Sequence, residues 1–521
     1  MARLFWLAIG LFSGLVAAVA AYGDSPVLSN ADSETYRAAF AAAHAEQWRA
    51  ARSLAARAQD PLLAKVLQWY LLLRPEAGAS FEEIASFISS NPDWPSLSAL
   101  RERAEDTIPD RSSAGRVREW FERYPPVSTT GRIRYAEALI GTGEQAKGVE
   151  GLRKTWIEGN FGERQEQIFL FRHFRQLRPE DHVARLDRLL WDGQTRAARS
   201  MLPHVDAGHA ALAEARMHLM RMAGGVDAAL RRVPPGLAND PGLLLDRVRW
   251  YRAKGRDAEA RAILMNPPVD LVQPDQWWEE RSLQVRNLLA SGHVADALRL
   301  AEEHGLTPRS ASYADGEWLA GWIALRFLRD PERALQHFQV LDEVVRYPVT
   351  RARIAYWQGR AFEAMGNRQA AATLYAAAAR FGMTYYGQLA ALRLDSSARP
   401  RVQRPPQPQP FQREAFEQRE LVRAVRALGA IGEDNLQEIF IKRIATLTTS
   451  SPEEAELIAD LVIEQVRSEF AVRLSRNTLH DAMPRPELGY PLRPLPDSTI
   501  PEAALVLAVI RQESAFDAKA I

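Results

Sequence analysis

The chain has 521 residues, of which 47% are hydrophobic and 25% charged, and its formal net charge is +1. This balance is that of a globular protein of about three domains, and it excludes the charge excess that indicates nucleic acid as a partner. There is no cysteine, and the ten histidines show no metal-ligand spacing. Because no phosphate-binding glycine motif is present either, we expect no metal, no cofactor and no nucleic acid to be bound.

Residues 1–20 have the pattern of a secretory signal peptide. Arg3 supplies the positive charge, an apolar stretch follows over 4–17, and the small residues at 18–20 form a cleavage site. An uncleaved membrane anchor is the alternative, because residues 4–23 carry no charge and nearly suffice to cross a bilayer. The glycines and alanines of this stretch favour cleavage, so we expect a periplasmic protein without a stable membrane anchor.

From residue 29 to residue 394 the pattern is helix after helix with short turns, which predicts an all-α superhelical repeat domain. Several turns share one form, a glycine or its equivalent before an alanine-rich helix, and they lie at Gly193, Gly225, Gly255, Gly292, Arg329 and Gly366. Their intervals are 32, 30, 37, 37 and 37 residues. Such a period is typical of a tetratricopeptide-like solenoid of helix pairs.

The last two repeats indicate how paired helices approach each other. A glycine, an alanine and an aromatic residue recur at equivalent positions, first as Gly321, Ala334 and Phe338 and then as Gly359, Ala371 and Tyr375. We expect the small residues to allow close approach and the aromatic ring to fill the gap.

Tryptophan placement allows two interpretations, helix packing and stacking on sugar rings. Trp69, Trp191, Trp318 and Trp357 lie amid apolar helix positions, which favours packing. The pair Trp277-Trp278 lies beside polar and acidic residues and is therefore the first candidate for sugar contact.

Two further segments precede the end of the chain. Residues 395–410 are polar and proline-rich, which predicts an extended linker; a proline-motif ligand is the less favoured alternative. Residues 411–483 have the pattern of several short helices and are predicted to form a helical linker domain.

The final segment, 497–521, predicts one helix that ends near Glu513. Pro501 suits the first helical position, behind the cap candidates Ser498 and Thr499. The apolar residues of this helix are Ala503, Ala504, Val506, Leu507, Val509 and Ile510. We expect such an apolar surface to lie inside a core, and therefore expect 497–521 to begin a domain whose remainder is outside this chain.

These residues resemble a known family. The run Ile500-Pro501, the apolar helix, and the segment 511–517 (Arg-Gln-Glu-Ser-Ala-Phe-Asp) look like the opening of the catalytic domain of the soluble lytic murein transglycosylases. That family is periplasmic and has a goose-type lysozyme-like catalytic domain. Segments 91–95 (Asn-Pro-Asp-Trp-Pro) and 384–390 resemble the beginning and end of its horseshoe-shaped helical domain, which a small linker domain closes into a ring.

The resemblance implies roles for individual residues. It maps the family's sole catalytic acid onto Glu513 and places Ser514 near the cleft. The alternatives are a solvated surface charge for Glu513 and a helix-end cap for Ser514, while Asp517 is interpreted as structural. The family's later Gly-Leu-Met-Gln and Ala-Tyr-Asn-Ala-Gly stretches are not present.

The implied activity is cleavage of the β-1,4 bond between N-acetylmuramic acid and N-acetylglucosamine in peptidoglycan, with formation of a 1,6-anhydro end. Expected partners are peptidoglycan glycan strands and proteins of cell-wall synthesis or hydrolysis. As it stands, the chain is expected to expose Glu513 and to be inactive. The alternative function is a non-catalytic periplasmic helical-repeat scaffold that binds glycan strands or proteins.

Overall fold

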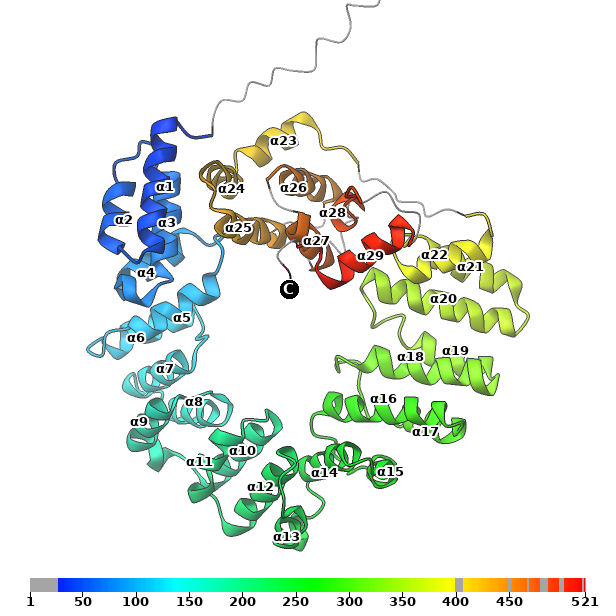
Figure 1. The fold of residues 1–521 in the computed structure, drawn as a ribbon. Helices are drawn as coiled ribbons and strands as arrows, with labels where there is room; N and C mark the ends of the chain where they lie inside the picture. The colour runs from blue at the N-terminus through cyan, green and yellow to red at the C-terminus, as the bar shows by residue number, and fades with distance from the viewer. Residues whose placement is uncertain are drawn as a thin grey trace, which may run out of the picture. The chain divides into compact units, whose positions relative to one another are not determined.

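The computed structural model describes residues 27–398, 406–447, 451–465, 468–477, 486–495, 501–517 and 520. Every regular element within these ranges is helical, which confirms the all-α prediction (Figure 1). In the same ranges, none of the helices has the length and apolar character needed to cross a bilayer. The predicted signal peptide, residues 1–20, lies outside the described residues.

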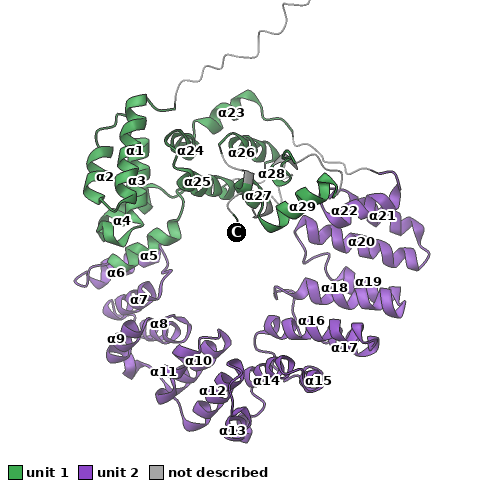
Figure 2. Cartoon of the chain, viewed as in Figure 1, with its two compact units in different colours: residues 1–107, 404–521 green, residues 108–403 purple. Residues whose placement is uncertain are grey.

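The chain divides into two compact units (Figure 2). Unit 1 comprises residues 1–107 and 404–521, and unit 2 comprises residues 108–403. The domain boundaries expected from the sequence remain predictions.

The first part of unit 1 contains α1 (Asn30–His44), α2 (Trp48–Ala55), α3 (Leu62–Leu72), η1 (Pro75–Ala77), α4 (Phe81–Ser90) and α5 (Leu97–Thr107). Its second part contains α23 (Pro410–Glu417), α24 (Glu420–Ile431), α25 (Asp434–Leu447), α26 (Pro452–Gln465), α27 (Ser468–Asn477), α28 (Pro486–Gly489) and α29 (Ala503–Glu513).

Unit 2 begins with α6 (Ala114–Arg123), α7 (Thr129–Gly141), α8 (Gln145–Glu158), α9 (Glu163–His173), η2 (Phe174–Gln176), α10 (Pro179–Trp191), α11 (Thr195–Ser200), η3 (Leu202–His204), α12 (Ala207–Met220), α13 (Val226–Arg231) and η4 (Pro235–Leu237). It continues with α14 (Pro241–Ala253), α15 (Asp257–Leu264), α16 (Pro274–Ala290), α17 (Val294–Glu302), α18 (Tyr313–Ile323), the π-helical η5 (Ala324–Leu328), α19 (Pro331–Gln339), α20 (Pro348–Ala364), α21 (Arg368–Ala379) and α22 (Tyr385–Leu394).

The turns that define the sequence repeat share one backbone conformation. Five of the six residues are glycines with φ between +70° and +80°, in the left-handed region that a residue without a side chain adopts readily. Arg329 takes the sixth place with φ +59° and ends the π-helical η5. The tetratricopeptide-like repeat is thus confirmed as a series of helix pairs joined by equivalent turns.

The predicted contact between glycine and aromatic ring is confirmed in both repeats. A Cβ atom added at Gly321 would lie 2.6 Å from the Phe338 ring, and one at Gly359 would lie 2.7 Å from the Tyr375 ring. Since real side chains do not approach so closely, each glycine allows the aromatic ring to fill the space between its two helices. These rings belong to one hydrophobic core that extends from Trp191 to Ala390.

In unit 1, the first helices contact the helices near the end of the chain. The indole nitrogen of Trp94 donates a hydrogen bond to Glu420 on α24 at 3.1 Å. Arg443 on α25 donates to the carbonyl oxygens of Asp93 and Pro92 at 2.9 and 3.2 Å. Trp94 is buried, and its ring lies edge-on to Phe440. Segment 91–95 therefore joins the first helices of unit 1 to α24 and α25, which lie more than 300 residues later in the sequence.

The predicted linker, 395–410, is not helical where it is described, except that its last residue, Pro410, begins α23. Helix α22 ends at Leu394 and α23 begins at Pro410, while residues 395–398 and 406–409 form no helix. This agrees with the effect of consecutive prolines, each of which removes a backbone donor.

Candidate functional site

Helix α29 carries the two residues that the sequence singles out. Its first residue is Ala503, preceded by Glu502 with an extended backbone (ψ 145°) as N-cap. The prediction that Pro501 occupies the first helical position is therefore wrong, since Pro501 lies before the cap. The proposed capping residues Ser498 and Thr499 lie outside the described residues.

The apolar surface of α29 is open to solvent. None of its side chains is buried, and Leu505 and Val509 are 54% and 52% exposed. The expected core around this helix is not formed by the described residues, because an apolar stripe becomes buried only where another element covers it. Glu513, the last residue of the helix, is likewise exposed, as expected for the chain as it stands.

Ser514 acts as the C-cap of α29 in this structure. Its hydroxyl donates to the carbonyl oxygen of Ile510 at 3.1 Å, and its backbone N–H donates to the same oxygen at 3.0 Å. This contact uses one of the carbonyls that a helix leaves unpaired at its C-terminal end. The structure thus shows Ser514 as a helix-end cap. A role of Ser514 near a cleft remains a prediction.

The backbone after Glu513 turns sharply. Ala515 and Phe516 have φ values of +51° and +67°, a region that L-residues with side chains occupy rarely. Ala515 is buried, and the N–H of Asp517 donates to Ser514 O at 2.9 Å to close the turn. Backbone strain of this kind costs on the order of 1–3 kcal/mol per residue and is concentrated at functional sites.

Arg511 connects α29 to the segment that precedes it in unit 1. Its Nε donates to the carbonyl oxygen of Gly489 at 2.6 Å, and its guanidinium lies 4.3 Å from the centre of the Tyr490 ring. Sequence reasoning included Arg511 only as part of the family motif, because the position of residues 489–490 beside it depends on the tertiary fold.

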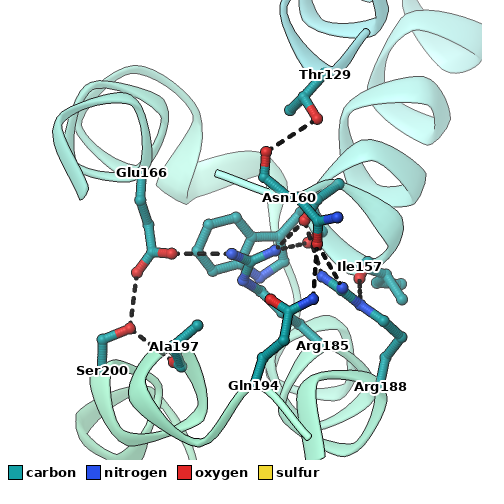
Figure 3. A network of polar contacts seen from close by, with 11 residues as sticks. Thr129, Ile157, Asn160, Glu166, Arg185, Arg188, Gln194, Ala197 and Ser200 are labelled. Atoms are coloured by element: carbon teal, nitrogen blue, oxygen red, sulfur yellow. Dashed lines mark hydrogen bonds and ion pairs between the residues drawn. The ribbon is translucent and has the colours of Figure 1, made fainter. Parts of the chain in front are cut away.

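A second polar network lies in unit 2 and joins α8, α9 and α10 (Figure 3). The Arg185 guanidinium donates to the carbonyl oxygens of Trp156 and Gly159 at 2.7 and 2.9 Å and to Glu166 at 2.9 Å. Arg188 donates to Ile157 O at 3.0 Å and to Gly159 O at 2.8 Å. The two arginines thereby satisfy the carbonyls at the end of α8, as cations near a helix C-terminus do.

This network is structural in character. The Arg185 side chain is only 1% exposed, and its guanidinium also lies 4.3 Å from the centre of the Trp156 ring. Burial lowers the pKa of Arg185, although its hydrogen bond to Glu166 acts in the opposite direction. Because the Arg185 guanidinium donates its hydrogen bonds to other groups of the protein, we interpret the network as a structural contact that stabilises the packing of successive helices.

A cluster of histidine and glutamate residues joins α17, α18 and α19. His337 places its two ring nitrogens 2.7 Å from Glu317 and 3.1 Å from Glu302, so that its protonated form can donate to both carboxylates. Burial lowers the pKa of His337, but these hydrogen bonds outweigh it and raise the pKa overall. Burial raises the pKa of Glu317, but the hydrogen bonds and charges of His304 and His337 outweigh this effect and lower its pKa to about 2. Among the described residues, no group of side chains could hold a metal ion.

Of the two interpretations for Trp277-Trp278, the structure supports helix packing and not sugar contact. Trp277 is fully buried, and Trp278 is 3% exposed with its indole nitrogen donating to Asp315 at 3.1 Å. Neighbouring helices cover both rings, so neither can meet a ligand.

Trp318 is partly buried and packs against the core of unit 2, as predicted, and it also lines an open hollow. This hollow has a volume of about 560 Å³ and is lined by Arg286, Leu289, Ala290, Trp318, Leu319, Trp322 and Phe327. The rings of Trp318 and Trp322 stack with centroids 5.9 Å apart. Trp318 and Trp322 are thus partly buried rings that line a hollow, whereas the pair Trp277-Trp278 is buried.

The architecture defines the class of protein as an all-α superhelix of helix pairs with additional helices at its C-terminal end. No protein-family model and no curated protein sequence matches the chain. Solved structures do match, and they establish the fold.

The 70-kDa soluble lytic transglycosylase from Escherichia coli matches with a TM-score of 0.59 and 16% identity over 93% of this chain and 77% of that one. Its complex with bulgecin A matches equally well. An inactive Glu-to-Gln mutant of the lytic transglycosylase Slt from Pseudomonas aeruginosa matches with a TM-score of 0.63 and 19% identity, over 92% and 77% of the two chains. The chain therefore shares the fold of the soluble lytic transglycosylases, as the resemblance implied.

Proposed function

We propose that this protein is a lytic transglycosylase of the periplasm that cleaves the β-1,4 bond between N-acetylmuramic acid and N-acetylglucosamine in peptidoglycan. The observation that carries the proposal is the carboxyl group of Glu513, which stands exposed at the end of α29 within the family-like segment 511–517. The shared fold supports the class, and the inactive Glu-to-Gln mutant of the Pseudomonas enzyme shows that a glutamate is essential in that protein.

In the proposed reaction Glu513 is the only acid. Protonated Glu513 donates its proton to the glycosidic oxygen, and the resulting carboxylate then accepts the proton of the C6 hydroxyl of the muramic acid. That hydroxyl attacks the anomeric carbon of its own sugar and leaves a 1,6-anhydro end. One carboxyl group suffices because the nucleophile belongs to the substrate and is held close, whereas most glycosidases need two.

We also propose that activity requires further residues that cover the apolar surface of α29. Exposed Leu505 and Val509 provide such a surface, and a contiguous apolar patch marks a place where another element binds. A general acid works best where water is excluded, so the site is expected to be complete only when this surface is covered.

Product chemistry provides the test. Purified peptidoglycan sacculi are incubated with the 521-residue chain and, in parallel, with the protein expressed from its complete reading frame, and the soluble fragments are analysed by mass spectrometry. We expect 1,6-anhydro fragments from the complete reading frame and none from the 521-residue chain. Fragments with ordinary reducing ends would indicate hydrolysis and would contradict the proposal.

A second candidate function is a non-catalytic scaffold that binds glycan strands or proteins, and an exposed apolar stripe in unit 2 favours it. The side chains of Ile168, Phe171 and Phe174 follow one another at three-residue spacing, and Phe171 is 92% exposed. We expect the 521-residue chain to sediment with sacculi or with cell-wall proteins, and Phe171→Ser to reduce sedimentation. Phe411→Ser, at an exposed phenylalanine of unit 1, is the matched control.

A further inference from the structure

We propose that Arg511 is a positioning residue, which together with Gly489 and Tyr490 orients the carboxyl group of Glu513. This inference rests on the proposed function, because it assigns a role at the same site. The Arg511 guanidinium makes two kinds of contact with one short segment: its Nε donates to Gly489 O at 2.6 Å, and its plane lies over the Tyr490 ring at 4.3 Å.

The carbonyl of Gly489 is a suitable partner for a cation. Gly489 is the last residue of α28, and the carbonyls at a helix end have no partner within the helix. Gly489 is buried, and a Cβ atom at this position would lie 3.1 Å from the hydroxyl of Ser475 on α27. Leu488 beside it is 1% exposed. The acceptor therefore belongs to a packed part of unit 1.

Helical geometry relates this contact to Glu513. Residues two positions apart in an α-helix project about 200° from each other, so Arg511 and Glu513 lie on nearly opposite sides of α29. When Arg511 is held against residues 489–490, the side chain of Glu513 is directed away from them and toward solvent, where it is observed. The contact thus determines which way the acid points.

The contact matters because α29 is not packed into a core. Within the described residues, no side chain of this helix is buried, so burial does not fix its orientation. A hydrogen bond from a charged donor and a cation–π contact can each shift a local equilibrium several-fold. Misplacement of a catalytic group by about 1 Å can lower a rate by about a hundredfold.

Hydrogen exchange tests the contact without requiring activity. In the 521-residue chain, we expect Arg511→Met to increase amide exchange of α29 about tenfold or more, with unchanged exchange in α24 of the same unit. Tyr490→Phe should resemble the unsubstituted chain because its ring retains the face that meets the guanidinium, whereas Tyr490→Leu should resemble Arg511→Met. Unchanged exchange in both Arg511→Met and Tyr490→Leu would overturn the proposed contact.

Kinetics test the positioning role in the protein expressed from its complete reading frame. We expect Arg511→Met to lower kcat by roughly tenfold to a hundredfold at nearly constant KM, and to change the pH profile of kcat, because the acid is displaced while substrate binding is kept. A folded Arg511→Met protein with unaltered kcat and pH profile would refute the role. If the unsubstituted protein forms no 1,6-anhydro product, the proposed function fails, and the exchange experiment still decides the contact.

Discussion

Arg185 in unit 2 and Glu513 in unit 1 are both charged residues of helices, yet their surroundings differ in every respect. The Arg185 side chain is 1% exposed and bonded to two carbonyls and a carboxylate. Glu513 is exposed at the end of a helix without a buried side chain. A charge that the fold surrounds with partners stabilises that fold, whereas a carboxyl group left accessible can react with a ligand.

The comparison predicts its largest effect on stability at Arg185. Arg185→Met removes the buried cation that pairs with Glu166 and donates to the carbonyl oxygens of Trp156 and Gly159, and only Trp156 O then has no other side-chain donor among these three acceptors. The free energy of unfolding should therefore fall by about 3–5 kcal/mol. The measurement is the midpoint of urea unfolding. The control is Arg196→Met, because the Arg196–Glu163 pair is 92% and 77% exposed and should contribute less than about 1 kcal/mol. Equal effects of the two substitutions would remove the distinction between buried and exposed charges.

A smaller effect is expected where glycine permits helix contact. Gly321→Ala brings a Cβ to 2.6 Å from the Phe338 ring and should destabilise unit 2 by about 1–3 kcal/mol. Gly115→Ala is the matched control, since no atom lies within 4 Å of its added Cβ and alanine favours the helix by about 1 kcal/mol. Thermal unfolding should therefore shift in opposite directions for the two variants.

The cluster around His337 should make stability depend on pH. Because the pKa of His337 is raised in the folded protein, its protonated form stabilises the fold. This contribution is complete below about pH 6.5, the ordinary pKa of histidine, and is lost as the pH rises through the raised pKa. Glu317, with its pKa lowered to about 2, contributes above its ordinary value of 4.5 and loses that contribution as the pH falls toward 2. His304, Arg333 and Glu302 complete the cluster.

We therefore expect His337→Gln to reduce stability most between about pH 4.5 and pH 6.5 and least at alkaline pH. Urea unfolding at several pH values measures this difference. A stability loss that is the same at pH 5.5 and at pH 9 would show that the histidine is not held as a cation. His293→Gln, at an exposed histidine beside Ser291, is the control.

The smallest effect is expected on α29 itself. Leu505→Ala in the 521-residue chain should change the free energy of unfolding by less than about 0.5 kcal/mol, because the leucine is already 54% exposed. In the protein expressed from its complete reading frame, the same substitution should cost about 2 kcal/mol or more if another element covers this surface. Equal and small losses in both proteins would contradict the proposed covering of α29.

Local patterns were predictable where neighbours along the chain decide the structure. The glycine turns and the Gly321–Phe338 contact follow from spacing, because each involves a residue pair within one helix pair. For Trp277-Trp278 the sequence left packing and sugar contact open, because polar neighbours in sequence do not reveal that adjacent helices bury both rings.

At the candidate site, the residues were predictable but their contacts were not. Glu513 was found from the motif, and the structure confirms that it is exposed and ends a helix. Arg511 and Gly489 are 22 residues apart in the sequence, and no repeat or helical periodicity relates them. Their contact therefore depends on the tertiary fold. The cluster around His337 was missed for the same reason. Its four members lie on three successive helices and the turn after the first of them: Glu302 on α17, His304 after α17, Glu317 on α18 and His337 on α19.

The most direct measurement compares Glu513→Gln with Asp517→Asn in the protein expressed from its complete reading frame, by the rate at which 1,6-anhydro fragments are released from sacculi. Glutamine has nearly the shape of glutamate but cannot donate the proton, so the rate should fall by on the order of a hundredfold to ten-thousandfold. Asp517→Asn should leave the rate nearly unchanged. If Glu513→Gln releases the fragments at the unsubstituted rate, Glu513 is not the catalytic acid and the proposed mechanism is wrong.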